Sequence, residues 1–255
     1  MDEVHVAAQQ GFTKEAQMYA RGRPEYPPAL ASWLTGPMEL APGRTVADVG
    51  AGTGKFTKLL PATGADVVAL EPVDAMRVQL QQSLPAVRAL AGAAQSIPLP
   101  GGSLDAVVCA QSFHWFANHA ALNEFHRVLK PGGKLGLVWN VRDESVDWVT
   151  QLTAIVTPYE GDAPRFYTGD WRQPFPHPGF TELVEHRCEH RHVGAPQQVI
   201  VERFMSVSFI AALAPAESAV VRERIEALIA THPALRGRAT VGFPYQTLAF
   251  HCTRI

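Results

Sequence analysis

A glycine-rich loop followed by an acidic residue is the part of the chain best suited to chemistry. The segment Asp48-Val49-Gly50-Ala51-Gly52-Thr53-Gly54 joins a carboxylate to three glycines spaced two residues apart. Glycines let the backbone turn tightly and let a ligand approach it closely. Glu71 ends the next β-rich run, where a carboxylate can accept hydrogen bonds from both hydroxyls of a ribose. The spacing predicts a nucleoside-containing ligand held between the loop and Glu71.

Three interpretations of this loop compete. A dinucleotide fingerprint places its third glycine three residues after the second, but Lys55 occupies that position here. A phosphate-binding P-loop requires a glycine where Val49 stands and Ser or Thr where Phe56 stands. An acidic residue leading into G-x-G-x-G, the loop that binds S-adenosylmethionine (SAM), matches at every position. The pattern favours SAM, with NAD or a purely structural turn as the alternatives.

The elements around the loop alternate between strand and helix. Strand-like runs cover residues 45–49, 66–70, 87–90, 104–110 and 134–141, with helical spacing after the first, second and fourth runs. Phe56, Leu59 and Leu60 predict a helix after the loop, and Asp74 is the expected N-cap of the next one. Strict alternation predicts a parallel sheet covered on both faces, and the continuous apolar runs agree with burial of both faces.

The pattern changes after Arg142. We expect a cap over residues 1–34 and a core over 35–142, completed by strands within 178–195 and 244–255. Residues 143–177 and 196–243 are expected to form a mainly helical lid over the substrate. Late strands with helices inserted between them are what a core with a lid requires.

Several segments together resemble a known family. VADVGAGTGKFTKLL, LEPVDAMR, GAAQSIPLPGGSLDAVVCAQSFHWF and HRVLKPGGKLGLVWN, spanning Val46 to Asn140, resemble a class I SAM-dependent methyltransferase of the type-11 group. Residues 19–27 resemble the N-terminal cap of the trans-aconitate methyltransferase-like branch. The resemblance implies an α/β, Rossmann-like fold with a seven-stranded, mostly parallel sheet. It also implies SAM as the cofactor.

The resemblance carries a set of cofactor contacts onto this chain. They are Tyr19, Arg23, Asp48, Gly50, Ala51, Gly52, Gly54, Glu71, Pro72, Met76, Ala94, Gln95, Ala110 and Gln111. Tyr19 and Arg23 would clamp the SAM carboxylate, because a guanidinium binds carboxylates through two parallel bonds. Ala93 and Gln95 stand where the family usually has a carboxylate, so the contact to the adenine amino group departs from the family pattern.

The acceptor side is expected just beyond the fourth strand. Its candidate residues are Tyr26, Trp115, Phe116, Trp139 and Asn140, and aromatic faces there can hold a flat substrate and stabilise a sulfonium. His114 is the candidate general base, since histidine has a pKa in the useful range. The alternative for His114 is packing or capping within the aromatic loop.

Composition and other motifs argue against several classes of partner and site. The net charge of -2 argues against nucleic acid as the main partner, and no apolar run reaches the length of a membrane helix. Three scattered cysteines indicate a cytoplasmic protein rather than a disulfide framework. We expect no metal, and we expect the histidines at positions 186, 190 and 192 to form a solvent-facing polar row.

The expected function is methyl transfer from SAM to a small-molecule acceptor. The alternatives are a SAM-binding protein without methyl transfer, such as a sensor or SAM-assisted cyclase, a methyltransferase acting on a macromolecule, and an NAD oxidoreductase. The trans-aconitate resemblance implies a polycarboxylate as one acceptor, which requires lid arginines such as Arg165 or Arg172 to point inward.

Overall fold

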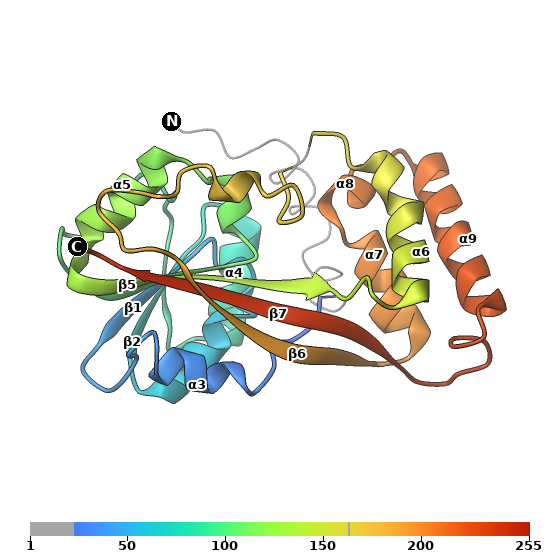
Figure 1. Ribbon diagram of the computed structural model, residues 1–255, viewed down its shortest axis with the longest axis horizontal. Coiled ribbons are helices and arrows are strands. Elements are labelled where there is room, and N and C mark those ends of the chain that lie inside the picture. The colour runs from blue at the N-terminus through green and yellow to red at the C-terminus, as the bar shows by residue number, and fades with distance from the viewer. Residues whose placement is uncertain (1–22, 163) are drawn as a thin grey trace.

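One seven-stranded sheet runs through the part of the chain that the computed structural model describes, residues 23–162 and 164–255 (Figure 1). The strands lie in the order β3-β2-β1-β4-β5-β7-β6. Their bounds are β1 Thr45–Val49, β2 Asp66–Leu70, β3 Arg88–Leu90, β4 Leu104–Ala110, β5 Leu129–Arg142, β6 Val184–Gly194 and β7 Val241–Thr253. The strands from β3 to β5 pair in parallel, whereas β7 pairs antiparallel with both β5 and β6.

Short helices connect the strands. The α-helices are α3 Leu30–Thr35, α4 Asp74–Ser83, α5 His119–Val128, α6 Asp147–Val156, α7 Arg203–Met205, α8 Ser208–Ala211 and α9 Pro215–Thr231. The 3₁₀ segments are η1 Thr57–Thr63, η2 Phe113–Trp115, η3 Thr157–Tyr159 and η4 Asp170–Arg172, and η5, Gln197–Glu202, is a π-helix. No helix among the described residues is long and apolar enough to cross a membrane.

The two faces of the sheet are buried by different helices. Successive side chains of a strand point to opposite faces, and in β4 Val107 joins the cluster that contains Phe125 of α5. Its neighbour Val108 joins the cluster that contains Trp33 of α3. This is the two-sided burial that the continuous apolar runs predict.

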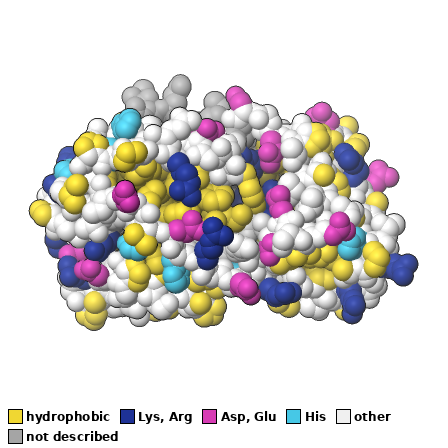
Figure 2. Space-filling view, in the orientation of Figure 1, with side chains coloured by type: hydrophobic (Ala, Val, Ile, Leu, Met, Phe, Trp, Pro, Cys, Tyr) yellow, Lys and Arg dark blue, Asp and Glu magenta, His cyan; other side chains and the backbone are white. Residues whose placement is uncertain are grey.

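A third cluster of buried side chains lies away from the sheet centre. It joins α6, η5, α7, α8 and α9, which gather at one end of the molecule in Figure 1. The far end of β7 reaches this cluster through Phe243 and Tyr245, while Phe250 of the same strand packs in the cluster beneath α5. Figure 2 shows hydrophobic side chains near the middle of one face, with acidic and basic groups interspersed over that face.

The structure confirms the predicted fold class, and it corrects several details. The segment after the glycine loop is the 3₁₀ segment η1 rather than an α-helix, and it contains Pro61, which has no backbone N–H to donate. Val73, not Asp74, is the N-cap of α4, and Asp74 instead pairs with Arg77 at 2.7 Å. β7 begins at Val241, earlier than expected.

The division into cap, core and lid stays a prediction. The described part of the predicted cap, α3, is packed into the main core through Trp33. Trp171, which falls in the predicted lid, is buried in the cluster beneath α5. The helical cluster of α6 to α9 corresponds to the remaining lid segments.

The close approach of α3 to the sheet gives a stability prediction. A Cβ at Gly136 of β5 would lie 2.7 Å from Cη2 of Trp33 and 2.8 Å from Cε of Met38. Gly136→Ala should therefore lower the free energy of unfolding by about 1–3 kcal/mol, the cost of overpacking. Gly242→Ala in β7 is the matched control, because its Cβ would meet its nearest neighbour at 3.7 Å. Urea denaturation of both variants measures the difference, and equal stabilities would contradict the packing argument.

Candidate active site

The glycine loop leaves β1 and is packed tightly against the end of β4. Gly50 and Gly52 have φ angles of 71° and 58°, in the left-handed region that favours glycine. A Cβ at Gly50 would lie 2.7 Å from Cβ of Ser112. The Ser112 hydroxyl donates to the carbonyl oxygen of Val49 at 2.8 Å, which fixes this contact. The loop backbone is therefore open to a ligand on one side and closed by β4 on the other.

Glu71 holds the loop in place from the end of β2. Its carboxylate accepts hydrogen bonds from the backbone N–H groups of Gly52 at 2.8 Å and Val73 at 2.9 Å. Only 5% of Glu71 is exposed, and burial raises the pKa of its carboxyl while the two N–H donors act against that rise. A carboxylate has about four lone-pair positions, so two remain for ribose hydroxyls.

Asp48 lies below the loop with one oxygen engaged. Its Oδ2 accepts from the Thr57 hydroxyl at 2.6 Å, whereas its buried Oδ1 has no hydrogen-bond partner. Burial raises the pKa of Asp48 to about 7, and the nearby charge of Glu71 acts in the same direction. A buried acceptor without a donor is suited to an ammonium group that arrives with a ligand.

A cavity of about 160 Å³ brings most of the predicted residues together. Its lining includes Arg23, Tyr26, Asp48, Gly50, Ala51, Gly52, Glu71, Pro72, Met76, Ala94, Gln95, Ala110, Gln111, Trp115, Phe116 and Asn140. These residues come from segments that meet at the carboxyl ends of the parallel strands, where open α/β sheets bind ligands.

Some predicted residues lie elsewhere. Gly54 has a φ of 86° and does not line the cavity, because Leu80 and Leu84 pack within 3.1 Å of where its Cβ would be. Trp139 lines the smaller cavity described below rather than this one, and its indole is buried among aromatic rings, with ring centroids 4.6 Å from Trp171 and 5.1 Å from Phe166. Tyr19 lies outside the described residues. The cofactor contact of Gly54 stays a prediction, and its packing against Leu80 and Leu84 does not favour it.

A second, smaller cavity of about 70 Å³ adjoins the first. The two share Arg23, Gln111, Trp115, Asn140 and Arg203 in their linings. The second cavity is closed by residues of β5, by the segment after Ala163 and by α7 and α8. The site thus has two connected compartments, one against the glycine loop and one beneath the helices α6 to α8.

His114 lines the second compartment and is poorly suited to proton abstraction. Its Nδ1 accepts a hydrogen bond from the Trp139 indole N–H at 3.1 Å. Burial lowers the pKa of His114 to about 3, and the positive charges of Arg165 and Arg23 lower it further. A group with this pKa binds a proton weakly at neutral pH. The general-base role stays a prediction, and this environment does not favour it.

Gln111 links the two compartments through a constrained backbone. It has a φ of 58°, unusual for a residue other than glycine, and its N–H donates to the Val138 carbonyl at 2.8 Å. Its side-chain amide donates to the backbone carbonyl of Asn140 at 3.2 Å. Strained backbone of this kind is often found at functional sites.

Two cationic residues of the first compartment were missed from the sequence. Lys55 donates to the carbonyl oxygen of Arg23 and pairs with Glu25 at 3.3 Å, which ties the segment before α3 to the glycine loop. Arg203 donates through Nε to the Tyr245 hydroxyl at 3.1 Å. Lys55 and Arg203 take part in the site through contacts between segments that are distant in the sequence. Local residue spacing therefore could not identify either of them.

The histidine row of β6 is not solvent-facing as expected. His186, His190 and His192 are partly buried on the same face as buried Cys188, and the exposed face carries Glu and Arg side chains. Burial lowers the pKa of His192 to about 4. The expectation was wrong because this face of β6 is partly covered: burial lowers the pKa of His190, and a hydrogen bond to the Glu25 backbone and the charge of Glu25 act against that shift.

The fold and this two-compartment site define a nucleoside-binding α/β enzyme, and comparisons identify its family. The methyltransferase domain model Methyltransf_11 matches residues 47–137. An uncharacterized methyltransferase of Mycobacterium tuberculosis, Rv3342, is 40% identical over 242 residues, 95% of each chain. Another of Schizosaccharomyces pombe, C25B8.10, is 36% identical and covers 94% of this chain and 93% of its own.

Solved structures agree with this family. A structure from Anaeromyxobacter dehalogenans, described as a candidate type II methyltransferase, has a TM-score of 0.65 at 25% identity, covering 91% of this chain and 96% of its own. The chain belongs to the class I SAM-dependent methyltransferases. It is an enzyme that uses SAM; the trans-aconitate branch is not established by these comparisons.

The residues present fit SAM. Asp48 offers a buried acceptor without a donor, Glu71 offers two remaining lone-pair positions, and the loop backbone at Gly50 is closed to any larger residue. Met76 and Pro72 line the same cavity beyond Glu71, where an apolar adenine face would lie. These features supply partners for the amine, the ribose and the base of the cofactor.

Removal of the Glu71 carboxylate should weaken cofactor binding. Glu71→Ala deletes the predicted ribose acceptor and two loop bonds, so we expect the affinity for S-adenosylhomocysteine to fall by about 1–3 kcal/mol, the scale of charged hydrogen bonds. Calorimetric titration measures this loss. Asp66→Ala, at the exposed opposite end of β2, is the matched control and should bind normally. An unchanged affinity in Glu71→Ala would contradict the ribose assignment.

Asp48 should make cofactor binding depend on pH. Its raised pKa of about 7 means that the neutral form prevails below that pH, whereas a cationic amine favours the ionised form. Affinity for S-adenosylhomocysteine should therefore rise as pH increases from about 5.5 to about 7, by at most about fifteenfold. Asp48→Asn, which stays neutral, should bind weakly with a flat profile. A similar rise in that variant would exclude Asp48 as the titrating group.

Proposed function

We propose that this enzyme transfers the methyl group of SAM to a small-molecule acceptor bound in the second compartment. The observation that carries the proposal is the shared wall between the two cavities, formed by Gln111, Trp115, Asn140 and two arginines. A cofactor bound against the glycine loop would meet an acceptor at this wall. The predicted substrate residues Tyr26, Trp115, Phe116 and Asn140 all line the first cavity.

The cofactor supplies a methyl group activated by a positive sulfur, which an acceptor atom takes with a lone pair as the carbon–sulfur bond breaks toward sulfur. The side chains and backbone of the enzyme contribute by positioning the two reactants. Glu71 and Asp48 hold the sugar and amine ends, and the glycine loop limits movement between them. Fixing two reactants in line can supply several kcal/mol of the barrier reduction.

The shared wall provides rigid neutral groups near the reacting atoms. Asn140 donates through Nδ2 to the carbonyl of Glu25 at 3.1 Å and accepts from the Thr247 hydroxyl at 2.6 Å, so its side chain is held from both ends. The aromatic rings of Trp115 and Phe116 line the same cavity and can stabilise the sulfonium. Positioning then replaces a strong base, which agrees with the lowered pKa of His114.

Labelled SAM tests the proposal. The full-length enzyme is incubated with methyl-labelled SAM and, separately, with the small-molecule, nucleic-acid and protein fractions of a cell extract. We expect label in the small-molecule fraction together with S-adenosylhomocysteine, and a large loss of label with Glu71→Ala. Label in a macromolecule would contradict the small-molecule acceptor. Tight cofactor binding without transfer to any fraction would favour the sensor or cyclase alternative.

A further inference from the structure

We propose that Arg142, Arg165 and Arg203 bind an oxyanion group of the acceptor, a carboxylate or a phosphate, and that this group is an anchor rather than the atom that is methylated. The inference rests on the proposed function, because it assigns the second compartment to the acceptor. It adds a ligand class and a subsite to that compartment.

The lining of the second compartment is strongly cationic. Arg23, Arg142, Arg165 and Arg203 all contribute to it, and among the described residues that line it there is no Asp or Glu. The remaining lining is aromatic or neutral, including Trp115, Trp139 and Phe166. A cavity of this composition is suited to a small anion with an apolar or aromatic body.

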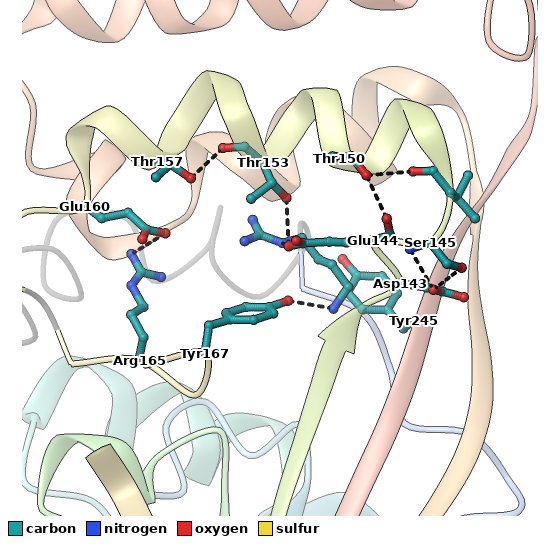
Figure 3. Close-up of polar contacts among 12 residues, drawn as sticks. Asp143, Glu144, Ser145, Thr150, Thr153, Thr157, Glu160, Arg165, Tyr167 and Tyr245 are labelled. Carbon is teal, nitrogen blue, oxygen red and sulfur yellow. Dashed lines mark hydrogen bonds and ion pairs between the residues drawn. The ribbon is translucent and has the colours of Figure 1, made fainter. Parts of the chain in front are cut away.

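Buried guanidinium donors in this compartment lack hydrogen-bond partners. Arg142 is 8% exposed, yet its Nε has no partner, and the same holds for Nε and Nη2 of Arg165. Glu144 and Glu160 form ion pairs with Arg142 Nε and Arg165 Nη2 at 3.8 Å, but these distances are too long for hydrogen bonds. Figure 3 shows Arg165 extending toward Glu160 beneath α6. Buried charged donors of this kind require an acceptor.

The Glu144 oxygen that faces Arg142 is engaged by a second, closer donor. It accepts from the Thr153 hydroxyl at 3.0 Å, on the inner side of α6 in Figure 3. The neighbouring Tyr167 hydroxyl accepts from the backbone N–H of Arg142 at 2.9 Å. The Arg142 side chain also contacts the Tyr167 hydroxyl and forms a long ion pair with Glu144, so Nε, which has no hydrogen-bond partner, is the Arg142 donor left for a ligand.

The guanidinium groups are held in place by neighbouring rings. The guanidinium of Arg142 lies 5.3 Å from the ring centroids of both Tyr167 and Phe204, and that of Arg165 lies 3.9 Å from the ring of Phe209. Stacking on an aromatic face leaves the N–H edge of a guanidinium free to bind an oxyanion. The subsite is thus organised before any ligand arrives.

The pKa of Arg165 agrees with a positive electrostatic potential in the second compartment. Burial lowers the pKa of Arg165 to about 10, and the charges of Arg142, Arg23 and Arg203 act in the same direction against Glu160. An anion bound among these groups would relieve their mutual repulsion.

The position of the subsite separates the anchor from the reacting atom. Arg142 and Arg165 line only the second compartment, whereas the cofactor methyl would arrive at the wall that both compartments share. An oxyanion paired with guanidinium groups is also a weak nucleophile, because its lone pairs are engaged. The new bond therefore forms between the methyl carbon and a second atom of the acceptor. The carbon–sulfur electron pair stays on sulfur, any proton on that atom passes to solvent, and the anchored group is unchanged.

Binding of matched probes tests the anchor. Benzoate, phenyl phosphate and the uncharged analogue benzamide are titrated into the full-length enzyme saturated with S-adenosylhomocysteine. We expect benzoate or phenyl phosphate to bind about tenfold or more tightly than benzamide. The tighter of the two oxyanions identifies the acid group as a carboxylate or a phosphate. Equal binding of all three probes would overturn the proposal.

Arginine variants locate the binding. Arg165→Gln should weaken the tighter oxyanion about tenfold or more, while its S-adenosylhomocysteine affinity and its folding, measured by circular dichroism, stay unchanged. Arg172→Gln is the matched control, because Arg172 is exposed, stacks over Trp171 and lines neither compartment. An unaltered oxyanion affinity in Arg165→Gln would overturn the subsite. If the unmodified enzyme did not bind S-adenosylhomocysteine, that result would instead refute the proposed function.

A reaction with benzoate tests whether the acid group is an anchor. Benzoate offers a carboxylate and no second nucleophilic atom, so incubation with SAM should give no methyl benzoate although benzoate binds. Mass spectrometry detects the ester directly. Formation of methyl benzoate would show that the bound oxyanion is itself methylated and would overturn the anchor role.

Discussion

The site depends on one buried carboxylate that joins two pieces of backbone. Glu71 directly follows β2 and accepts from the N–H groups of Gly52 and Val73, so it fixes the glycine loop to the start of α4. Hydrogen bonds from N–H groups to a carboxylate are stronger than those to a neutral acceptor. Without this link the loop would keep its glycines but lose its defined distance from β2. The ribose acceptor and the loop support are therefore the same side chain.

Burial then determines the charges of the groups around this link. Asp48 and Glu71 both have raised pKa values because they are shielded from water, and they raise the cost of each other's ionisation. Burial lowers the pKa of His114 in the second compartment, and the charges of Arg165 and Arg23 lower it further. The first compartment is lined by both acidic and basic side chains, whereas among the described residues that line the second compartment the charged ones are arginines.

The sequence was informative where the structure depends on short-range spacing. The strands, the positive φ of the loop glycines and the position of Glu71 follow from residues within one β-α-β unit, and the structure agrees with the predicted fold. The arginines of the second compartment come from β5, from the segment after Ala163 and from α7, which meet only through tertiary packing. Trp139 was expected at the end of the fifth strand, but β5 continues to Arg142; the Trp139 ring lines the second compartment and also packs against Trp171. The point where a strand ends and the packing of its side chains depend on neighbours that local patterns do not specify.

The length of β7 limits how the molecule can move. The strand runs from Val241 to Thr253, pairs along its length with β5 and β6, and contributes buried side chains to both the sheet-centred and the helical clusters. A continuous ladder of hydrogen bonds resists bending between its ends. The sheet-centred and helical clusters therefore cannot rotate apart about a hinge. We therefore expect any movement that admits a ligand to take place in short segments that line the cavities, rather than as a rotation of one cluster against the other.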